Sequence, residues 1–302
     1  MIFNKFFILF KIGRKIGKSN IINIVSETHK IPVFIKLFFN LLAFSFSSSN
    51  NTNSKDKENL SESIQEMGTT FIKLGQFLAT RPDIIGEKLS KELESLQDKL
   101  PPFSKKEAEK IIIENLGQSN FNDIIDLSEP IAAASIAQVH KAKIKEDNII
   151  KNVAIKVLRP NIKKIFNDEI DAIMLLAYIV ESLVAKTKRL KLIEVVFLFK
   201  EITNHEMDLR FEAAAANEYA ENTKNDLGFF VPKIYWNFTS ESVLTLDWVD
   251  GVSIREKDLL KEKNIETSKI ATNLIQHFLR HAVRDGFFHA DMHQGNIFIN
   301  ES

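Results

Sequence analysis

The stretch FFHADMHQGNIFIN at residues 287–300 places polar side chains between two apolar runs. His289, Asp291 and Asn296 follow the spacing H-x-D-x-x-x-x-N. A carboxylate can accept a proton from a hydroxyl nucleophile, and an amide oxygen is the kind of hard ligand that a divalent ion such as Mg²⁺ prefers. An apolar run, a polar turn and a second apolar run predict a strand, a loop and another strand, so we expect these side chains on a loop. The residue types indicate metal-assisted phosphoryl transfer.

This spacing is also that of the protein-kinase catalytic loop, in which the Asp accepts the substrate proton and the Asn holds a metal. Three residues alone do not decide the function, because such a pattern also arises by chance. Two alternatives therefore stay open. One is a metal site built from His289, Asp291 and His293, and the other is an ordinary polar loop.

A second motif, VAIK at 153–156, matches the strand whose lysine contacts the α- and β-phosphates of a nucleotide. A lysine on an alternating strand is usually only solvated, but Lys156 precedes the catalytic-loop motif in the order found in kinases. Phosphates also need a loop whose backbone approaches them closely, and such loops are normally rich in Gly. The corresponding place holds Ala132, Ala133, Ala134 and Ser135. Alanine allows less backbone freedom, so we expect phosphate contacts that differ from those of an ordinary kinase.

A phosphate-binding lysine in a kinase-like lobe needs an acid on a helix to orient it. The segment HEMDLRFEAAAAN offers Glu206, Asp208 and Glu212. Glu206 and Asp208 are two residues apart and are not helical neighbours, so they would project toward different partners. The alternative is that all three belong to a solvated helix face.

The composition excludes several classes of function. Forty basic and forty acidic residues give zero net charge, so the whole protein has no field that would attract nucleic acid. The absence of cysteine excludes disulfides, thiolate zinc sites and a cysteine nucleophile. With 44% apolar residues, the chain can bury a substantial core.

Hydrophobic periodicity predicts helices, then a small sheet, then further helices. Apolar residues three and four apart mark a helix from Leu60 onward, and SKKE at 104–107 is a capping box for a later helix that Gly117 closes. Alternation predicts strands over 131–144 and 152–160 around a turn near 145–148. The remaining expected elements are helices over about 162–186, 192–223 and 266–285, and a strand pair around 231–238 and 242–251. This order predicts a two-lobed α+β fold.

The first 18 residues are basic and apolar, with Lys and Arg interleaved with Phe and Ile and no acid. Such a segment is typical of a helix lying at a membrane interface, although a helix packed on the protein's own core fits equally well. The apolar run 31–46 is shorter than the roughly 20 residues that span a bilayer. The polar run that follows, at 47–59, is typical of a linker.

Taken together, these motifs resemble the UbiB-type atypical kinase-like family, whose members support ubiquinone biosynthesis. The K-x-G-Q signature of that family is matched by Lys73, Gly75 and Gln76, its Ala-rich loop by residues 132–140, and its E-x-D signature by Glu206 and Asp208. Its catalytic loop is matched by HADMHQGN, with Gln294 where Pro is usual. The resemblance runs from about residue 60 to the end of the chain.

The resemblance implies a protein-kinase-like fold that binds ATP or ADP with Mg²⁺. Residues 1–46 would be a membrane-interfacial segment, 47–59 a linker, 60–117 a helical extension, 118–250 an N-lobe with inserted helices, and 251–302 the start of the C-lobe. Asp291, Lys156 and Glu206 would be catalytic, Asn296 would hold the metal, and residues 132–135 with Lys156 would bind the nucleotide.

The resemblance also implies regulatory or occluding roles for Lys73, Gly75, Gln76, Asp208 and Glu212. In this arrangement Glu206 would be the partner of Lys156, while Asp208 or Glu212 would tether the extension through Lys73. Spacing alone leaves these pairings open. The extension would sit where a peptide substrate enters, so we expect ATP hydrolysis or phosphorylation of a small or lipidic molecule rather than of a protein.

The implied setting is the cytoplasmic face of a bacterial inner membrane. The implied partners are a nucleotide, the membrane surface or quinone-precursor lipids, and other quinone-biosynthesis proteins, without nucleic acid.

One departure from the family pattern concerns the metal-binding D-F-G motif, which is expected about a dozen residues beyond Asn296. The sequence ends at Ser302 without it. We therefore expect a C-terminally truncated chain, or sequence fragment, with little or no turnover of its own. The alternatives are a small-molecule phosphotransferase of the same superfamily, which would lack K-x-G-Q, and a non-enzymatic, nucleotide-responsive scaffold.

Overall fold

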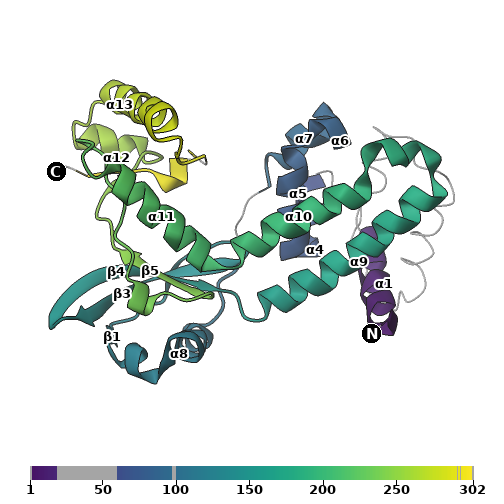
Figure 1. The fold of residues 1–302 in the computed structure, drawn as a ribbon, viewed down its shortest axis with the longest axis horizontal. Helices are drawn as coiled ribbons and strands as arrows, with labels where there is room; N and C mark the ends of the chain where they lie inside the picture. The colour runs from purple at the N-terminus through teal and green to yellow at the C-terminus, as the bar shows by residue number, and fades with distance from the viewer. Residues whose placement is uncertain (1, 19–59, 97–99, 291, 293, 301–302) are drawn as a thin grey trace. The chain divides into compact units, whose positions relative to one another are not determined.

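The computed structural model describes residues 2–18, 60–96, 100–290, 292 and 294–300 (Figure 1). The chain divides into two compact units. The first comprises Met1–Phe103, Ala133–Gln138 and Leu158–Met207, and the second comprises Ser104–Ala132, Val139–Val157 and Asp208–Ser302. Each unit is described by itself.

The first unit is built from helices. Its elements are α1 (Ile2–Lys18), α4 (Leu60–Met67), α5 (Thr69–Ala79), α6 (Pro82–Ile85), α7 (Glu87–Leu93), α9 (Ile162–Leu183), the 3₁₀ helix η1 (Ala185–Leu190) and α10 (Leu192–Glu206). Two apolar clusters hold these helices together. One joins α4 to α7 through Leu60, Leu89, Leu93 and Leu96, and the other joins α1, α4, α5 and α9 through Ile12, Met67, Phe71 and Ala172.

Helix α1 buries its central face in the first unit. Ile12 is 3% exposed within the second of those clusters, and Lys15 Nζ donates to the carbonyl oxygen of Met67 at 2.8 Å. On the outer side Phe7 stays 56% exposed beneath the ammonium group of Lys11. The face of α1 around Ile12 therefore packs on the protein's own core, which is one of the two alternatives given above for this segment. The apolar run 31–46 and the linker 47–59 lie outside the described residues.

The second unit is organised around an antiparallel sheet. Its strands are β1 (Ile124–Ile125), β2 (Pro130–Ala133), β3 (Ala137–Glu146), β4 (Ile149–Leu158) and β5 (Val243–Asp247). The order is β1-β3-β4-β5, with β2 also paired to β3. The turn between β3 and β4 uses Asp147 and Asn148 at positive φ, a backbone conformation that Asp and Asn tolerate and that hairpin turns favour. The predicted hairpin near 145–148 is confirmed.

Alternation along β4 decides which side chains enter the core. Val153, Ile155 and Val157 are fully buried, so Lys156 lies on the opposite face of the strand. In the register with β5, Lys156 is opposite Leu244. The sheet thereby presents the lysine on its non-core face.

Two helices of the second unit pack on this sheet. Helices α8 (Lys105–Asn122) and α11 (Leu209–Thr223) both contact β5, and in Figure 1 they lie on opposite sides of it. The predicted capping box at the start of α8 is present, since Ser104 Oγ accepts from the Glu107 amide and Glu107 reaches back to Ser104. Gly117 interrupts α8 at φ 81°, the left-handed region in which glycine is favoured.

The end of the chain continues as helices and a short strand pair. The elements are the 3₁₀ helix η2 (Trp236–Phe238), β6 (Val252–Ser253), α12 (Lys257–Glu262), α13 (Thr267–Arg280), the π-helix η3 (His281–Asp285), the 3₁₀ helix η4 (Gln294–Asn296) and β7 (Phe298–Ile299). Gly286 ends η3 at φ 64°. Gly251 lets β6 approach β7, because an added Cβ would lie 3.0 Å from the carbonyl oxygen of Ile299.

Three sequence expectations need correction. The helix expected over 192–223 is two helices, α10 and α11, because Asp208 caps a new helix. The strand expected over 231–238 is a single bridge from Ile234 to Leu246 followed by η2. No strand precedes the loop at 289–296, where the π-helix η3 and Gly286 lead in instead. The predicted α+β class is confirmed.

The compact units also cut across the predicted domain boundaries. Helix α8, expected in the extension, belongs to the unit with the sheet, whereas α9 and α10, expected as insertions in the N-lobe, belong to the unit with the extension. The cause is packing: α9 and α10 contact each other and α5, while α8 contacts β1 and β5.

Candidate functional site

Lys156 pairs with a different carboxylate from the one that sequence analysis expected. Its Nζ donates to both carboxylate oxygens of Glu212, at 2.9 and 2.7 Å. Glu212 lies in the first turn of α11, on the same unit as strand β4. The Lys156 side chain is 27% exposed, so its ammonium group is oriented by Glu212 and still reaches solvent. A charged donor fixed in this way is suited to bind an anion.

The expected pair between Lys156 and Glu206 is therefore wrong. Glu206 is the last residue of α10, in the other unit, and its Oε2 lies 3.1 Å from Lys73 Nζ on α5. The physical reason is the break at Met207 and Asp208, which places Glu206 and Glu212 on separate helices. Glu206 instead pairs with Lys73, the lysine of the K-x-G-Q signature.

Asp208 acts as the N-cap of α11. Its Oδ1 accepts from the backbone amide of Arg210 at 3.1 Å. The Arg210 guanidinium also donates to both oxygens of this carboxylate, at 2.9 and 2.6 Å. This hydrogen-bonded pairing with Asp208 raises the pKa of Arg210. Capping satisfies an amide that the first turn of a helix leaves without a partner. Asp208 thus contributes to where α11 begins.

The Ala-rich stretch forms the turn between β2 and β3. β2 ends at Ala133, and the Ala134 amide donates to the carbonyl oxygen of Ala137 at 2.8 Å. Ser135 is fully buried, and its hydroxyl has no hydrogen-bond partner among the described residues. A buried hydroxyl without a partner is costly in a folded protein, so this turn holds an unsatisfied polar atom where a loop that binds phosphate is expected.

Arg159 supports this turn, and sequence analysis missed it. Its Nε and Nη2 both donate to the carbonyl oxygen of Ala134, at 3.1 and 2.8 Å, and its amide donates to Ile136. A third donor, Nη1, reaches the carbonyl oxygen of Pro101 at 3.0 Å. The guanidinium therefore ties the turn to the segment just after the K-x-G-Q helices. The available signal was the position of Arg159 directly after the strand that carries Lys156.

Gln138 makes a second link to the same segment. Its side chain accepts from the Phe103 amide at 2.9 Å and donates to the Phe103 carbonyl oxygen at 3.2 Å. Gln138 is 1% exposed, so both bonds are shielded from water. Together Arg159 and Gln138 fix the backbone of the turn within the first unit.

The K-x-G-Q residues Lys73, Gly75 and Gln76 lie on α5. Gly75 sits where α5 contacts its neighbours, because a Cβ at this position would overlap Leu96 Cδ1 and lie 3.4 Å from Ile64 Cγ2. At this position it is close packing, and not a positive φ, that favours glycine. Lys73, two residues earlier on the same helix, pairs with Glu206 on α10.

The catalytic-loop motif is described in part. Asp291 and His293 lie outside the described residues, so the predicted convergence of Asp291 with Lys156 stays a prediction, as does the alternative metal site that needs both. His289 follows η3, and Asn296 closes η4. His289, Asn296 and Lys156 all belong to the second unit.

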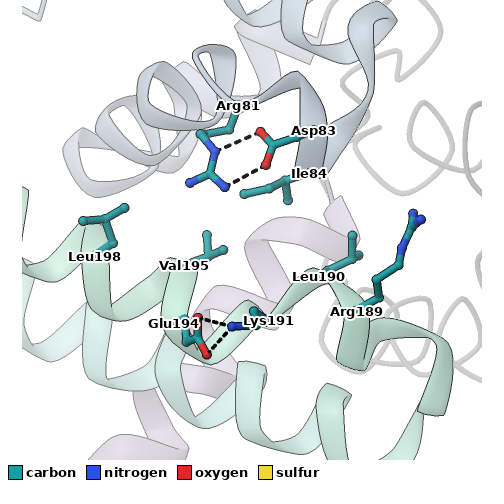
Figure 2. A pocket seen from close by; sticks show the side chains of 9 residues that line it. All are labelled: Arg81, Asp83, Ile84, Arg189, Leu190, Lys191, Glu194, Val195 and Leu198. Carbon is teal, nitrogen blue, oxygen red and sulfur yellow. Dashed lines mark hydrogen bonds and ion pairs between the residues drawn. The ribbon is translucent and has the colours of Figure 1, made fainter.

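A cavity of about 510 Å³ lies elsewhere in the first unit, between the α6 region and the start of α10 (Figure 2). The Arg81 guanidinium donates two hydrogen bonds to the Asp83 carboxylate, at 2.9 and 2.7 Å. The Lys191 ammonium group donates to both oxygens of the Glu194 carboxylate, at 3.0 and 2.9 Å. These charges neutralise one another, and none of the predicted site residues lines the cavity. We assign it no chemistry.

Comparison with known proteins places the chain among kinase-like proteins. Residues 95–302 match the ABC1 atypical kinase-like domain. The chain is 33% identical over 274 residues to a "Probable protein kinase UbiB" of Marinobacter nauticus, covering 90% of this chain and 49% of that relative. It is 36% identical over 242 residues to a protein of the same name from Tolumonas auensis, covering 80% of this chain and 44% of the relative. The chain thus spans about half the length of these curated relatives.

A solved structure supports the fold. The chain resembles Rv3197 of Mycobacterium tuberculosis, solved in complex with erythromycin, with a TM-score of 0.50 and 24% identity over 76% of this chain and 56% of that one. The family match covers more than half of the sequence and includes the Ala-rich turn, Lys156, Glu212 and the His289–Asn296 loop. The chain therefore belongs to the ABC1 atypical kinase-like family.

Proposed function

We propose that this chain binds ATP or ADP with Mg²⁺ and is the nucleotide-binding part of an atypical kinase or ATPase. The observation that carries the proposal is the two-pronged contact between Lys156 on β4 and Glu212 on α11, at 2.7 and 2.9 Å. In kinase-like proteins a helix-borne glutamate holds the strand lysine that contacts the α- and β-phosphates. The same chemistry, a lysine oriented by a carboxylate and still open to solvent, supports phosphate binding here.

The residues present also fit the nucleotide and its metal. Ser135 offers a buried hydroxyl without a partner among the described residues, in the turn expected to face phosphates. Asn296 would supply an oxygen ligand to Mg²⁺, and Asp291 would accept the proton of the attacking hydroxyl or water. When bound, the metal would neutralise charge on the phosphate oxygens. Lys156 would hold those oxygens in place.

The substrate we propose is water or a small or lipidic molecule rather than a protein. This choice follows the family resemblance, in which the K-x-G-Q residues Lys73, Gly75 and Gln76 would occlude the peptide site. Within the first unit, the pair between Lys73 and Glu206 at 3.1 Å and the close packing at Gly75 hold the K-x-G-Q helix to its neighbours.

We further propose that the activity supports ubiquinone biosynthesis, in contact with a bacterial inner membrane, its quinone-precursor lipids and the other proteins of that process. Relatives at 31–36% identity that carry the name "Probable protein kinase UbiB" support this assignment. None of the helices within the described residues is both long and apolar enough to span a lipid bilayer.

Nucleotide-dependent thermal stability tests the proposal. We expect Mg²⁺ with ADP or ATP to raise the melting temperature, because a ligand at 100 times its Kd stabilises the native state by about 2.7 kcal/mol. Lys156→Ala should abolish this shift. Lys151→Ala is the matched control, since Lys151 is an exposed lysine of the same strand. An equal shift in both variants, or none in the unmodified chain, would contradict nucleotide binding at Lys156.

A further inference from the structure

Helix α11 carries two contacts to chemistry-bearing segments on one face. Glu212 holds Lys156 near the start of the helix, and Tyr219 lies seven residues later. Seven residues are close to two helical turns, so the two side chains share a face and are separated by about 10.5 Å along the axis. Tyr219 is 9% exposed. Helix α11 therefore contributes Glu212 to the pair with Lys156 and Tyr219 to a buried site farther along the helix.

The Tyr219 side chain contacts residues that lead into the catalytic loop. Its hydroxyl lies 2.8 Å from His281 Nδ1 on η3. The ring packs edge-on against Phe229 and Phe287, with centroids 5.4 and 6.1 Å apart. Burial raises the pKa of Tyr219, which keeps the hydroxyl protonated and able to donate.

The network has a consistent direction of donation. The Tyr219 hydroxyl donates to Nδ1 of His281, and Nε2 of His281 donates in turn to Asp226 Oδ2 at 2.9 Å. In this arrangement every donor faces an acceptor, with the ring proton of His281 on Nε2.

Asp226 closes the network. The guanidinium of Arg284 donates to both oxygens of the carboxylate, at 2.8 and 2.9 Å, and Arg280 lies 3.6 Å from Oδ1. Bonding to Arg284 keeps the pKa of Asp226 well below its usual range. The carboxylate is therefore ionised at neutral pH, as an acceptor for His281 must be.

The competing interpretation is a cation site. Asp226, His277 and His281 are buried with ligand atoms within 4.8 Å of one another, and Nδ1 of His277 has no hydrogen-bond partner among the described residues. A divalent ion there would face the guanidinium groups of Arg280 and Arg284 at close range, and like charges repel strongly in a buried site. It would also displace the bond between His281 and Asp226. The hydrogen-bond network is the interpretation that the charges favour.

We propose that Tyr219 is a positioning residue that fixes η3, the turn that leads into the His289–Asn296 loop, to the helix that holds Lys156. Through it, α11 positions both the nucleotide lysine and the turn from which the catalytic loop starts. The geometry of the π-helix fits this role, because a π turn carries an extra residue and often occurs at functional sites. The link to phosphoryl transfer rests on the proposed function, whereas the contact itself does not.

The test removes one oxygen. Tyr219→Phe keeps the ring and its packing but deletes the donor to His281 Nδ1. We expect the backbone amides of η3, residues 281–285, to exchange with solvent roughly tenfold faster in NMR measurements on the 302-residue chain, since one hydrogen bond that holds the turn is lost. The ¹⁵N resonance of His281 Nδ1 should shift as its donor disappears.

Tyr235→Phe is the matched control. Tyr235 is a buried tyrosine of the same unit whose hydroxyl donates to Asp247 Oδ1 at 2.6 Å. This variant should leave the η3 amides and the His281 ring resonances unchanged. If Tyr219→Phe leaves exchange of the η3 amides unchanged, or if both variants accelerate it equally, the positioning role is overturned.

Two further measurements separate this inference from the proposed function and from the cation-site interpretation. Amide exchange is measured without nucleotide, so failure of the Mg-ADP shift would overturn the proposed function and leave the Tyr219 result standing. Stoichiometric Zn²⁺ tests the cation site. A melting temperature that rises with Zn²⁺ in the unmodified chain but not in His277→Gln would overturn the hydrogen-bond network, and no rise supports it.

Discussion

Lys73 on α5 and Glu206 at the end of α10 form an ion pair, with 3.1 Å between Nζ and Oε2. The lysine side chain is 17% exposed and the glutamate 39% exposed, so solvent screens the pair incompletely. This contact joins the K-x-G-Q helix to the last turn of α10. It is the direct physical basis for assigning Glu206 to the extension rather than to the nucleotide lysine.

A double-mutant cycle measures the strength of this pair. Lys73→Met and Glu206→Gln should each lower the free energy of unfolding, and we expect a coupling energy of about 0.5–1 kcal/mol in urea unfolding at low salt. The coupling should shrink as ionic strength rises. Lys91→Met on α7 is the control, because Lys91 is exposed and has no ion-pair partner among the described residues. Coupling of zero at low salt would show that the pair does not hold the extension.

The pairing of Lys156 with Glu212 predicts which glutamate supports nucleotide affinity. Glu212→Gln keeps the shape of the side chain but removes the charge that orients Lys156. We expect ADP to bind roughly three- to tenfold more weakly in calorimetric titrations with Mg²⁺, since a charge-assisted contact is replaced by a neutral one.

Two variants control this measurement. Glu218→Gln changes an exposed glutamate of the same helix and should leave affinity unchanged. Glu206→Gln should also leave it nearly unchanged, because Glu206 bonds Lys73 in the first unit. A larger loss with Glu206→Gln than with Glu212→Gln would mean that the expected pair, and not the observed one, serves the nucleotide.

The elements of the site could be predicted from the sequence, but the choice of the acid could not. Alternation identified β4 and the exposed side of Lys156, and the apolar spacing identified α5 beneath Lys73. The acid depended on a helix boundary at Met207 and Asp208, where neither Gly nor Pro marks a break. An Asp can start a helix or continue one, and tertiary packing decides between them.

Contacts between segments that are distant in the chain could not be predicted from the sequence either. Arg159 reaches Pro101, 58 positions away, and Tyr219 reaches His281, 62 positions away. No periodic pattern connects such residues, because the contacts follow from how whole elements pack. Each residue had a plain local interpretation, as a strand-terminal charge or a helical aromatic, and only the fold shows what it bonds.

Gly75 offers a test of the packing of the extension. In an exposed helix Gly→Ala would stabilise by up to about 1 kcal/mol, but the added methyl group here would overlap Leu96 Cδ1. We expect Gly75→Ala to lower the free energy of unfolding by about 1–2 kcal/mol, because the Leu96 side chain must shift within its buried cluster with Leu60, Leu89 and Leu93.

The matched variant for Gly75 is Leu96→Val, which shortens the obstructing side chain. The cost of Gly75→Ala should be smaller in the Leu96→Val background than in the unmodified chain, as measured by urea unfolding. Equal costs in the two backgrounds would show that Gly75 is required for a reason other than contact with Leu96.

His140 predicts a pH dependence of stability. It is fully buried on β3, where its Nδ1 lies 2.8 Å from the carbonyl oxygen of Ser128. Burial lowers its pKa, and the bond to Ser128 offsets this only in part. In the unfolded chain a histidine takes up a proton near pH 6.5. The stability due to a depressed pKa is therefore present above that value and is lost as the pH falls through the folded-state pKa.

Replacing His140 by Gln removes the titration while leaving a group able to bond Ser128. We expect the free energy of unfolding to fall less between pH 7 and about pH 5 in His140→Gln than in the unmodified chain. His277, whose pKa burial also lowers, is present in both proteins, so the difference in slope isolates His140. Urea unfolding at several pH values measures this difference. Parallel slopes would mean that His140 is not held neutral in the folded state.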